Sequence, residues 1–301
     1  MSLKVYSVSL GSSSRNHETE AELLGKKITI KRTGTDGDIE KACRMVASLD
    51  GHIDAFGLGG IDFYLSISGD KYPLPDAFKI AAHARKTPMV DGFGVKNLVE
   101  DKIAAILTDE LKFDPQKTKI FFVCAMNRAL MAESLEKSGF EMIFGDFMSA
   151  TKMPVPVYSL KTGRLFAKLA APFATRILPY RFIYPVGNDQ NERKERFGEY
   201  FRWADIIAGD FNYINRHAPL DLGGKTIITT SVTEDNARCL KDRGVKYLVT
   251  TYPRLGGRAF GANVIEAAMV ALAGKNRPLM PGEYMEILQK LNFKPEFEKL
   301  N

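Results

Sequence analysis

The sequence contains few cysteines and no apolar run that approaches the length of a membrane span. Its 301 residues include three cysteines, Cys43, Cys124 and Cys239, which lie far apart. This odd and scattered set fits neither a disulfide framework nor a zinc site, so we expect small core residues and no metal. The N-terminal stretch has no basic leader followed by an apolar core, and nothing reaches the roughly twenty apolar residues of a transmembrane helix. These absences predict a cytoplasmic protein.

The modules by which proteins bind nucleic acids are also missing, although the chain is basic. We find no helix-turn-helix, zinc or base-stacking pattern and no internal repeat. The net charge of +6 is carried by residues 151–203, which hold ten Lys or Arg against four Asp or Glu. We therefore expect no nucleic acid, and we expect attraction for an anionic partner to centre on this basic insert.

The middle of the basic insert mixes large apolar side chains with Lys and Arg. From Leu165 to Val186, this pattern can form an amphipathic surface that meets a membrane or another subunit. Pro172, Pro179 and Pro185 argue against one long helix. A homodimer contact, or a lid over a cleft, is favoured over a membrane contact.

Length and patterning predict two α/β domains, each a mostly parallel sheet with helices on both faces. The chain exceeds the usual size of one core, and its 45% hydrophobic and 26% charged residues are ordinary for a globular protein. Strands and helices alternate along the first domain. We expect strands at 3–10, 28–32, 53–58 and 87–90, and helices at 18–24, 38–49 and 75–84.

A long amphipathic helix at 95–111 is expected to connect the two domains. The predicted N-terminal domain is 1–94, and a Rossmann-like domain covers 112–260 with the basic insert inside it. Helices within 261–301 are expected to pack back on the first domain. In the second domain we expect strands at 120–123, 140–144, 205–208, 225–230 and 246–250, and helices after Asn127, at 192–203, at 234–243 and at 261–272.

The unit from Thr118 to Asp146 has the layout of a dinucleotide-binding βαβ unit. Asp146 ends its second strand about twenty residues after the first turn, where an acid accepts the ribose hydroxyls of NAD. The turn Val123–Arg128 lacks the glycines that let backbone approach a pyrophosphate. The pattern therefore favours the scaffold more strongly than the cofactor.

Polar side chains follow several strands of the second domain. Asn127 and Arg128 follow its first strand, and hydroxyls end two neighbouring strands at Thr229, Thr230 and Thr250. Because ligands of open parallel sheets bind beyond the carboxyl ends of strands, these residues are candidate cofactor contacts. Helix capping and turn formation are the alternative.

The loop 254–263 is the part of the chain best suited to an oxyanion. Arg254 and Arg258 supply fixed positive charge, Gly256 and Gly257 allow close backbone approach, and Asn263 opens the following helix. Turning a crowded corner is the alternative, because the loop lacks the Lys-Ser/Thr ending of a P-loop.

Asp91 is the candidate catalytic acid of the first domain. It ends a strand between glycine-containing steps, and Lys71 and Lys96 lie nearby in sequence. A lysine beside a carboxylate can move a proton to or from a substrate hydroxyl when burial brings its pKa toward neutrality. A turn aspartate with solvated lysines is the alternative.

The order of parts resembles the quinate/shikimate 5-dehydrogenases. The stretch Val90-Asp91-Gly92-Phe93-Gly94 looks like the Thr-Asp-Gly-x-Gly of that family, and a connecting helix and a Rossmann-like domain follow. The resemblance implies that Asp91 contacts substrate and partners a catalytic lysine, for which Lys71 is the candidate. It also implies a nicotinamide cofactor, and Asp146 favours NAD over NADP because a carboxylate repels a 2′-phosphate.

Two functions remain open from the sequence. The first is an oxidoreductase of quinate/shikimate dehydrogenase type that acts on a small hydroxy acid, with Arg254 and Arg258 on its anionic groups. The second is a non-redox protein that retains the cleft and binds a small anion or a nucleotide there without dehydrogenase activity.

Overall fold

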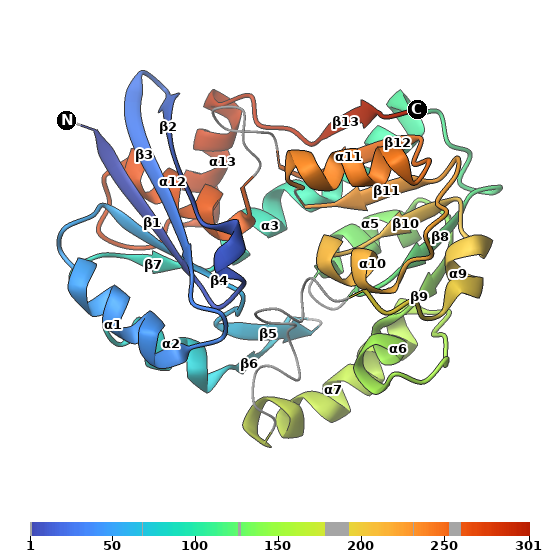
Figure 1. The fold of residues 1–301 in the computed structure, drawn as a ribbon, viewed down its shortest axis with the longest axis horizontal. Helices are drawn as coiled ribbons and strands as arrows, with labels where there is room; N and C mark the ends of the chain where they lie inside the picture. Colours follow the sequence, from blue (N-terminus) through green and yellow to red (C-terminus); the bar gives the residue numbers. More distant parts are fainter. Residues whose placement is uncertain (1, 68, 126–127, 178–192, 231, 253–259) are drawn as a thin grey trace.

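The computed structural model describes residues 2–67, 69–125, 128–177, 193–230, 232–252 and 260–301. These residues form two α/β lobes that lie side by side (Figure 1). Each lobe is a mostly parallel sheet with helices on both faces, so the predicted fold class is confirmed.

The sheet of the first lobe has the strand order β2-β3-β1-β4-β7. Its four parallel strands are β1 (Leu3–Ser9), β3 (Lys26–Gly34), β4 (Ala55–Gly59) and β7 (Met89–Val90). The edge strand β2 (His17–Leu23) pairs antiparallel with β3. Residues 18–24 were predicted as a helix, and that prediction is wrong. The stretch alternates exposed and less exposed side chains with a period of two, which suits an edge strand.

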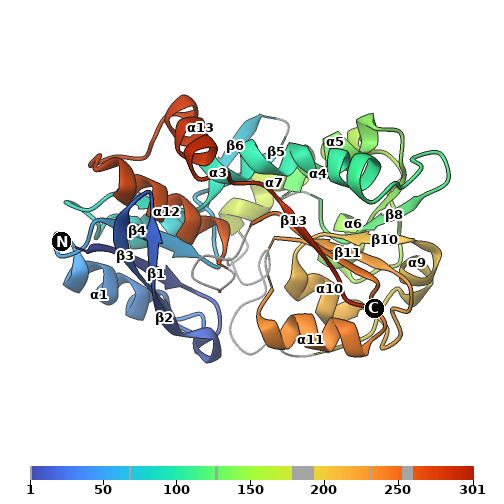
Figure 2. The same cartoon turned by 90° about the horizontal axis from the view of Figure 1, so that it is seen from above.

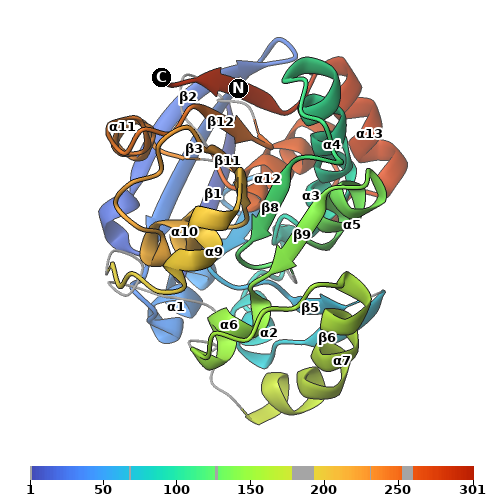
Figure 3. The same ribbon diagram turned by 90° about the vertical axis from the view of Figure 1, so that its right-hand side faces the viewer.

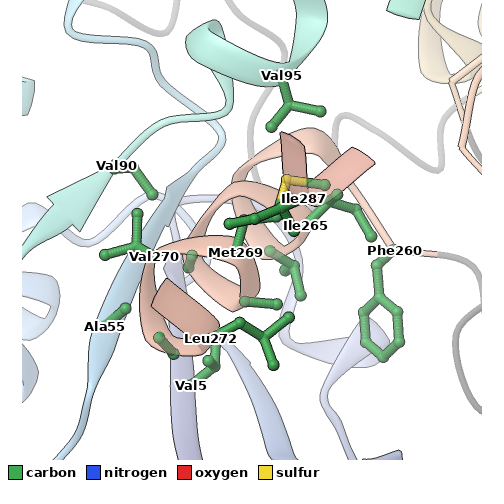
Figure 4. Packing of buried hydrophobic residues seen from close by; sticks show 14 of the residues in the cluster. Val5, Ala55, Val90, Val95, Phe260, Ile265, Met269, Val270, Leu272 and Ile287 are labelled. Carbon is green, nitrogen blue, oxygen red and sulfur yellow. The ribbon is translucent and has the colours of Figure 1, made fainter. Parts of the chain in front are cut away.

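Helices from both ends of the chain cover this sheet. One face carries α1 (Ile39–Leu49) and α2 (Pro75–Ala81). Asp38 caps the first turn of α1 by accepting from the N–H of Lys41. The other face carries α12 (Ala262–Ala273) and α13 (Pro281–Lys290). Figure 4 shows Val270 and Leu272 of α12 among Val5, Ala55 and Val90. These C-terminal helices therefore complete the core of the first lobe.

The connector between the lobes is an interrupted helical run. It comprises α3 (Phe93–Val99), the 3₁₀ turn η2 (Glu100–Lys102), α4 (Ile103–Ala105) and the π-helical turn η3 (Ile106–Glu110). Val95 lies in the core of the first lobe, whereas Ile103 and Leu107 lie in that of the second. The connector is therefore held by both cores.

The sheet of the second lobe has the order β13-β12-β11-β10-β8-β9. The parallel strands are β8 (Lys119–Phe122), β9 (Glu141–Phe144), β10 (Ile206–Ala208), β11 (Thr226–Thr229) and β12 (Tyr247–Thr250). The antiparallel edge strand β13 (Glu296–Lys299) returns from α13 to this lobe, at a place where a helix was expected. Figure 2 shows this return across the molecule.

Successive side chains of β8 enter the cores on opposite faces of the sheet. Ile120 and Phe122 of β8 pack with α5 (Ala129–Lys137), whereas Phe121 packs on the other face. That second face is covered by α9 (Gly198–Trp203), α10 (Phe211–His217) and α11 (Glu234–Asp242). A short helix, α6 (Asp146–Thr151), follows β9.

The basic insert contributes one long helix, α7 (Leu160–Ile177), with Pro172 inside it. The expectation that its prolines prevent a long helix is therefore wrong for Pro172. Ala167 and Ala171 of α7 pack against a hairpin of the first lobe, formed by β5 (Tyr64–Ile67) and β6 (Asp70–Pro73) (Figure 3). The opposite face leaves Leu165, Phe166, Leu169 and Phe173 exposed. Within the described residues, no helix is both long and apolar enough to cross a bilayer.

Candidate functional site

A cleft of about 710 Å³ opens between the two lobes. Its walls come from the carboxyl ends of strands in both sheets, where open parallel sheets bind their ligands. In the second lobe, Arg128 and Asp210 follow β8 and β10, the neighbouring strands at which the sheet order reverses. The polar lining includes Ser7, Ser9, Arg15, Arg32, Asp62, Asp91, Lys96, Arg128, Asp210, Asn212, Thr230 and Asn263.

One end of the cleft carries two arginines, and we call Arg15 and Arg32 the arginine end. Arg15 lies in the 3₁₀ turn η1 (Ser13–Arg15) after β1, and its guanidinium reaches Asn212 of the second lobe at 3.5 Å. Arg32 lies in β3 and donates to the carbonyl of Ser12 and the hydroxyl of Ser9, both at 3.1 Å. Among the described residues, no carboxylate forms an ion pair with Arg32.

Burial and the neighbouring Arg15 disfavour the charge of Arg32. Burial, followed by the charge of Arg15, lowers the pKa of Arg32 to about 10. Burial likewise lowers the pKa of Arg15, and Asp210 acts in the opposite direction. The arginine end is therefore a place where a bound oxyanion would relieve both desolvation and repulsion.

The other end of the cleft holds cations that have carboxylate partners, and we call it the paired end. Lys96 Nζ lies 2.9 Å from Asp62, with side chains 14% and 17% exposed. Arg128 lies 2.6 Å from Glu100, with side chains 7% and 2% exposed. Although burial opposes both charges, Asp62 raises the pKa of Lys96 and Glu100 raises that of Arg128. Because Glu100 is on the connector, its pair joins the connector to the second lobe.

Asp91 lies at the paired end as a turn-forming carboxylate. Its two oxygens accept from the N–H groups of Phe63 at 2.8 Å and of Phe93 at 3.0 Å. Burial, and then the charge of Asp62, raises the pKa of Asp91, and Lys96 acts in the opposite direction. Lys71 instead lies on the exposed hairpin, with Nζ 5.5 Å from the ring centre of Tyr64 and 5.1 Å from that of Phe93.

The glycines after Asp91 are explained by the approach of α12. Gly92 has φ +97°, and a Cβ there would lie 2.6 Å from the Cβ of Ala262. A Cβ at Gly94 would lie 2.6 Å from Oε1 of Glu266 and 2.7 Å from Tyr284. The Asp-Gly-x-Gly sequence therefore has a packing reason.

Glu266 is a buried carboxyl group in the middle of α12. Its Oε1 accepts from the hydroxyl of Tyr284 at 2.6 Å, and the N–H groups of Gly92 and Gly94 also face the carboxyl. Burial is the main reason that its pKa rises to about 7. The turn and α12 therefore share a proton-dependent contact behind the cleft.

The described part of the turn after β8 is held by a carboxylate from the start of α6. Asp146, the predicted ribose acid, accepts from the N–H of Ala125 at 3.0 Å. Burial, and then the charge of Asp146, raises the pKa of the Cys124 thiol well above its usual range. The carboxylate that was predicted to bind a ribose therefore accepts from the backbone of this turn.

The predicted site residues fall into four groups. Asp91, Arg128, Thr230 and Asn263 line the cleft. Thr250 lines a separate cavity of about 220 Å³, whereas Lys71, Asp146 and Thr229 line neither. Asn127 and the loop residues Arg254, Gly256, Gly257 and Arg258 lie outside the described residues.

Sequence reasoning missed most of the charged lining. Arg15, Arg32, Asp62 and Asp210 were not proposed, although the available signal was the same as for Asp91. Arg15, Asp62 and Asp210 each lie within a few residues of the carboxyl end of a parallel strand, and Arg32 is near the end of β3.

Several solved structures resemble the chain over most of its length. A galactofuranose-binding protein shares 13% identity at a TM-score of 0.40, covering 96% of this chain and 98% of that one. The periplasmic binding protein of an arabinose ABC transporter from Shewanella sp. ANA-3 shares 11% identity at a TM-score of 0.39, and the match covers 96% of each chain. The NAD-dependent malic enzyme of Thermotoga maritima shares 12% identity at a TM-score of 0.34, and the match covers 96% of this chain and 84% of that one. All three TM-scores are below 0.5, so no functional argument rests on these likenesses.

No curated protein matches the chain. Two family models do: residues 4–91 match "Domain of unknown function (DUF8753)" and residues 94–300 match "Domain of unknown function (DUF8754)". The resemblance to quinate/shikimate 5-dehydrogenases, and the oxidoreductase function drawn from it, are therefore wrong. The catalytic roles of Lys71 and Asp91 lose the support of that resemblance, and the NAD and homodimer expectations stay predictions. With the larger model matching residues 94–300, the chain belongs to the family described as domain of unknown function DUF8754.

Proposed function

We infer that this protein reversibly binds a small anionic molecule in the cleft between its lobes and carries out no dehydrogenase chemistry there. The observation that supports this function is the arginine end. Arg32 is a partly buried cation with another cation beside it and no ion-pair partner among the described residues. Burying charge in this way lowers stability unless an opposite charge joins it.

The surrounding groups suit one oxyanion, either a carboxylate or a phosphate. The forked guanidinium of arginine matches the oxygens of both groups. Hydroxyls of Ser9 and Ser14 lie in the same part of the lining. Arg15 also contacts Asn212 of α10 at 3.5 Å, so the arginine end lies against the second lobe.

Thermal unfolding with simple anions tests this function. Phosphate and acetate are each compared with chloride at equal ionic strength, and phosphate at ten times its Kd should stabilise the protein by about 1.4 kcal/mol. That corresponds to a rise in Tm of roughly 2–4 °C. Comparing the two anions shows whether the site prefers a phosphate or a carboxylate.

Two variants localise the effect. Arg32→Gln should abolish the rise in Tm, and Arg15→Gln should do the same. Arg44→Gln, on the exposed side of α1, is the matched control and should keep the rise. The inference fails if neither anion stabilises the wild type, or if Arg32→Gln responds as the wild type does. NAD, predicted from the sequence, is added as a further probe of the same cleft.

A further inference from the structure

The paired end of the cleft differs chemically from the arginine end, and this difference bears on the rest of the ligand. Asp62 and Lys96 place a carboxylate and an ammonium 2.9 Å apart on the lining. Asp91 is beside them. A second anionic group of a ligand would meet two carboxylates here, whereas a hydroxyl can donate to Asp62 and accept from Lys96.

Two glycines after β4 and the amide of Asn263 line the cleft close to β1. Strand β4 ends at Gly59, and the next residue, Gly60, has φ +78°. A Cβ at Gly59 would lie 3.0 Å from the Ser9 hydroxyl and 3.1 Å from the Asn263 amide nitrogen. That amide donates to the hydroxyl of Ser7 at 2.9 Å. Gly59 is therefore required by the close packing of β1 and α12 against β4, and both glycines line the cleft.

The strand order sets the distance between the ends. Arg32 is on β3 and Asp62 follows β4, and β1 lies between these strands. Two strand spacings amount to about 10 Å. A five- or six-carbon chain or ring with one anionic substituent spans such a distance.

We propose that the ligand is a small polyhydroxylated molecule with one phosphate or carboxylate, held by its anionic group at Arg15 and Arg32 and by its hydroxyls at Asp62, Lys96 and Asn263. This proposal rests on the anion-binding function above and adds a requirement for hydroxyls. A site that hydrogen-bonds hydroxyls rejects analogues lacking them, because its own polar groups are then left unpaired.

Matched pairs of five-carbon probes test the requirement by calorimetry. Ribose 5-phosphate is compared with pentyl phosphate, and ribonate with pentanoate, so that each pair differs mainly in its hydroxyls. In the favoured pair, the hydroxylated member should bind at least tenfold more tightly than its deoxygenated partner. Inorganic phosphate and free ribose are run beside them, and both should bind more weakly than ribose 5-phosphate if the phosphate pair is favoured.

Variants separate the two ends. Asp62→Asn should remove most of the tenfold preference for the hydroxylated member of the pair, and Arg32→Gln should weaken the binding of every anionic probe. Asp101→Asn, an exposed acid on η2, is the control and should change neither. Circular dichroism and urea unfolding confirm that each variant is folded, and Asn263→Ala provides a second test of hydroxyl recognition.

The outcomes distinguish this proposal from the function on which it rests. Equal affinity within both pairs overturns the hydroxyl requirement and leaves anion binding intact. A preference that survives Asp62→Asn in a folded protein overturns the assignment of the hydroxyls to Asp62 and also leaves anion binding intact. Failure of all the anionic probes overturns both. Binding of free ribose as tight as that of ribose 5-phosphate overturns the assignment of an anionic group to the arginine end.

Discussion

The two ends of the cleft contain the same kinds of charged side chain but differ in how their charges are satisfied. At the paired end, Arg128 and Lys96 each have a carboxylate within 2.9 Å. At the arginine end, Arg32 contacts only uncharged oxygens among the described residues. A buried charge in a cleft can therefore have either of two roles. A paired charge is part of the scaffold, whereas a charge that repels its neighbour is suited to a ligand.

Removing the buried Arg128–Glu100 ion pair at the paired end should cause the largest loss of stability. Glu100→Gln leaves the Arg128 guanidinium buried without its carboxylate, which typically costs about 3–5 kcal/mol. Urea denaturation measures the change in the free energy of unfolding. Glu18→Gln is the control, because it breaks the Lys31 pair, whose side chains are 47% and 54% exposed, and should cost less than about 1 kcal/mol. Similar losses for the two variants would contradict a structural role for the buried pair.

The contact between α12 and the turn behind the paired end should depend on pH. The pKa of Glu266 is about 7 when folded and 4.5 as the reference value, so the folded state binds this proton more tightly. Its contribution is therefore fully present below pH 4.5 and is lost as the pH rises to 7. At 1.36 kcal/mol per pKa unit, the loss is about 3 kcal/mol.

Comparing wild type with Glu266→Gln isolates this contribution from the other titrating groups. The difference in unfolding free energy between the two proteins should change by about 3 kcal/mol between pH 4.5 and 8. Parallel pH profiles would show that Glu266 titrates normally and that its burial carries no such cost.

The Gly92→Ala variant tests how closely α12 approaches the turn after Asp91 at the paired end. The variant forces φ +97° on a residue with a Cβ and brings that atom to 2.6 Å from Ala262, so we expect a loss of about 1–3 kcal/mol. Gly69→Ala has a similar φ of +87° and nothing within 4 Å of the new Cβ. The excess loss at position 92, measured by thermal unfolding, therefore reports packing against α12, and equal losses would argue against it.

The arginine end should give the smallest change in stability. Arg32→Gln removes hydrogen bonds to Ser9 and Ser12 but also removes the repulsion from Arg15, so these effects should nearly cancel. In chloride we expect a change within about 1 kcal/mol in urea denaturation. A loss as large as that of Glu100→Gln would place Arg32 among the scaffold charges and remove the contrast between the ends.

Local patterns were sufficient to predict the alternation of strands and helices and both sheets. Asp38 as a cap and the apolar strands near Ile120 and Ile227 carry signals that do not depend on distant contacts. The edge strand at 17–23 was misassigned because its Glu-rich sequence resembles an exposed helix. Its pairing with β3, including a Glu18–Lys31 contact, decides the outcome.

The site was only partly predictable because it depends on how the lobes face each other. The rule that ligands bind beyond strand ends identified Asp91, Arg128 and Thr230, and the glycine- and arginine-rich loop pattern identified Asn263. The strand-end rule could not distinguish Lys71 from Lys96 as the lysine beside Asp91, because α3 places Lys96 at Asp62 whereas the hairpin places Lys71 over the rings of Tyr64 and Phe93. The Asp-Gly-x-Gly sequence was misleading because close packing by α12 requires the same glycines as a substrate turn.

The most direct test is to observe the arginine side chains by ¹⁵N NMR while phosphate is titrated into arginine-labelled protein. The Nε–Hε signals of Arg15 and Arg32, assigned with the two Gln variants, should shift together and saturate with a single Kd. The signal of Arg128 should stay in place because Glu100 already holds its guanidinium. A shift of Arg128 without Arg32, or no saturable shift of Arg32, would contradict anion binding at the arginine end.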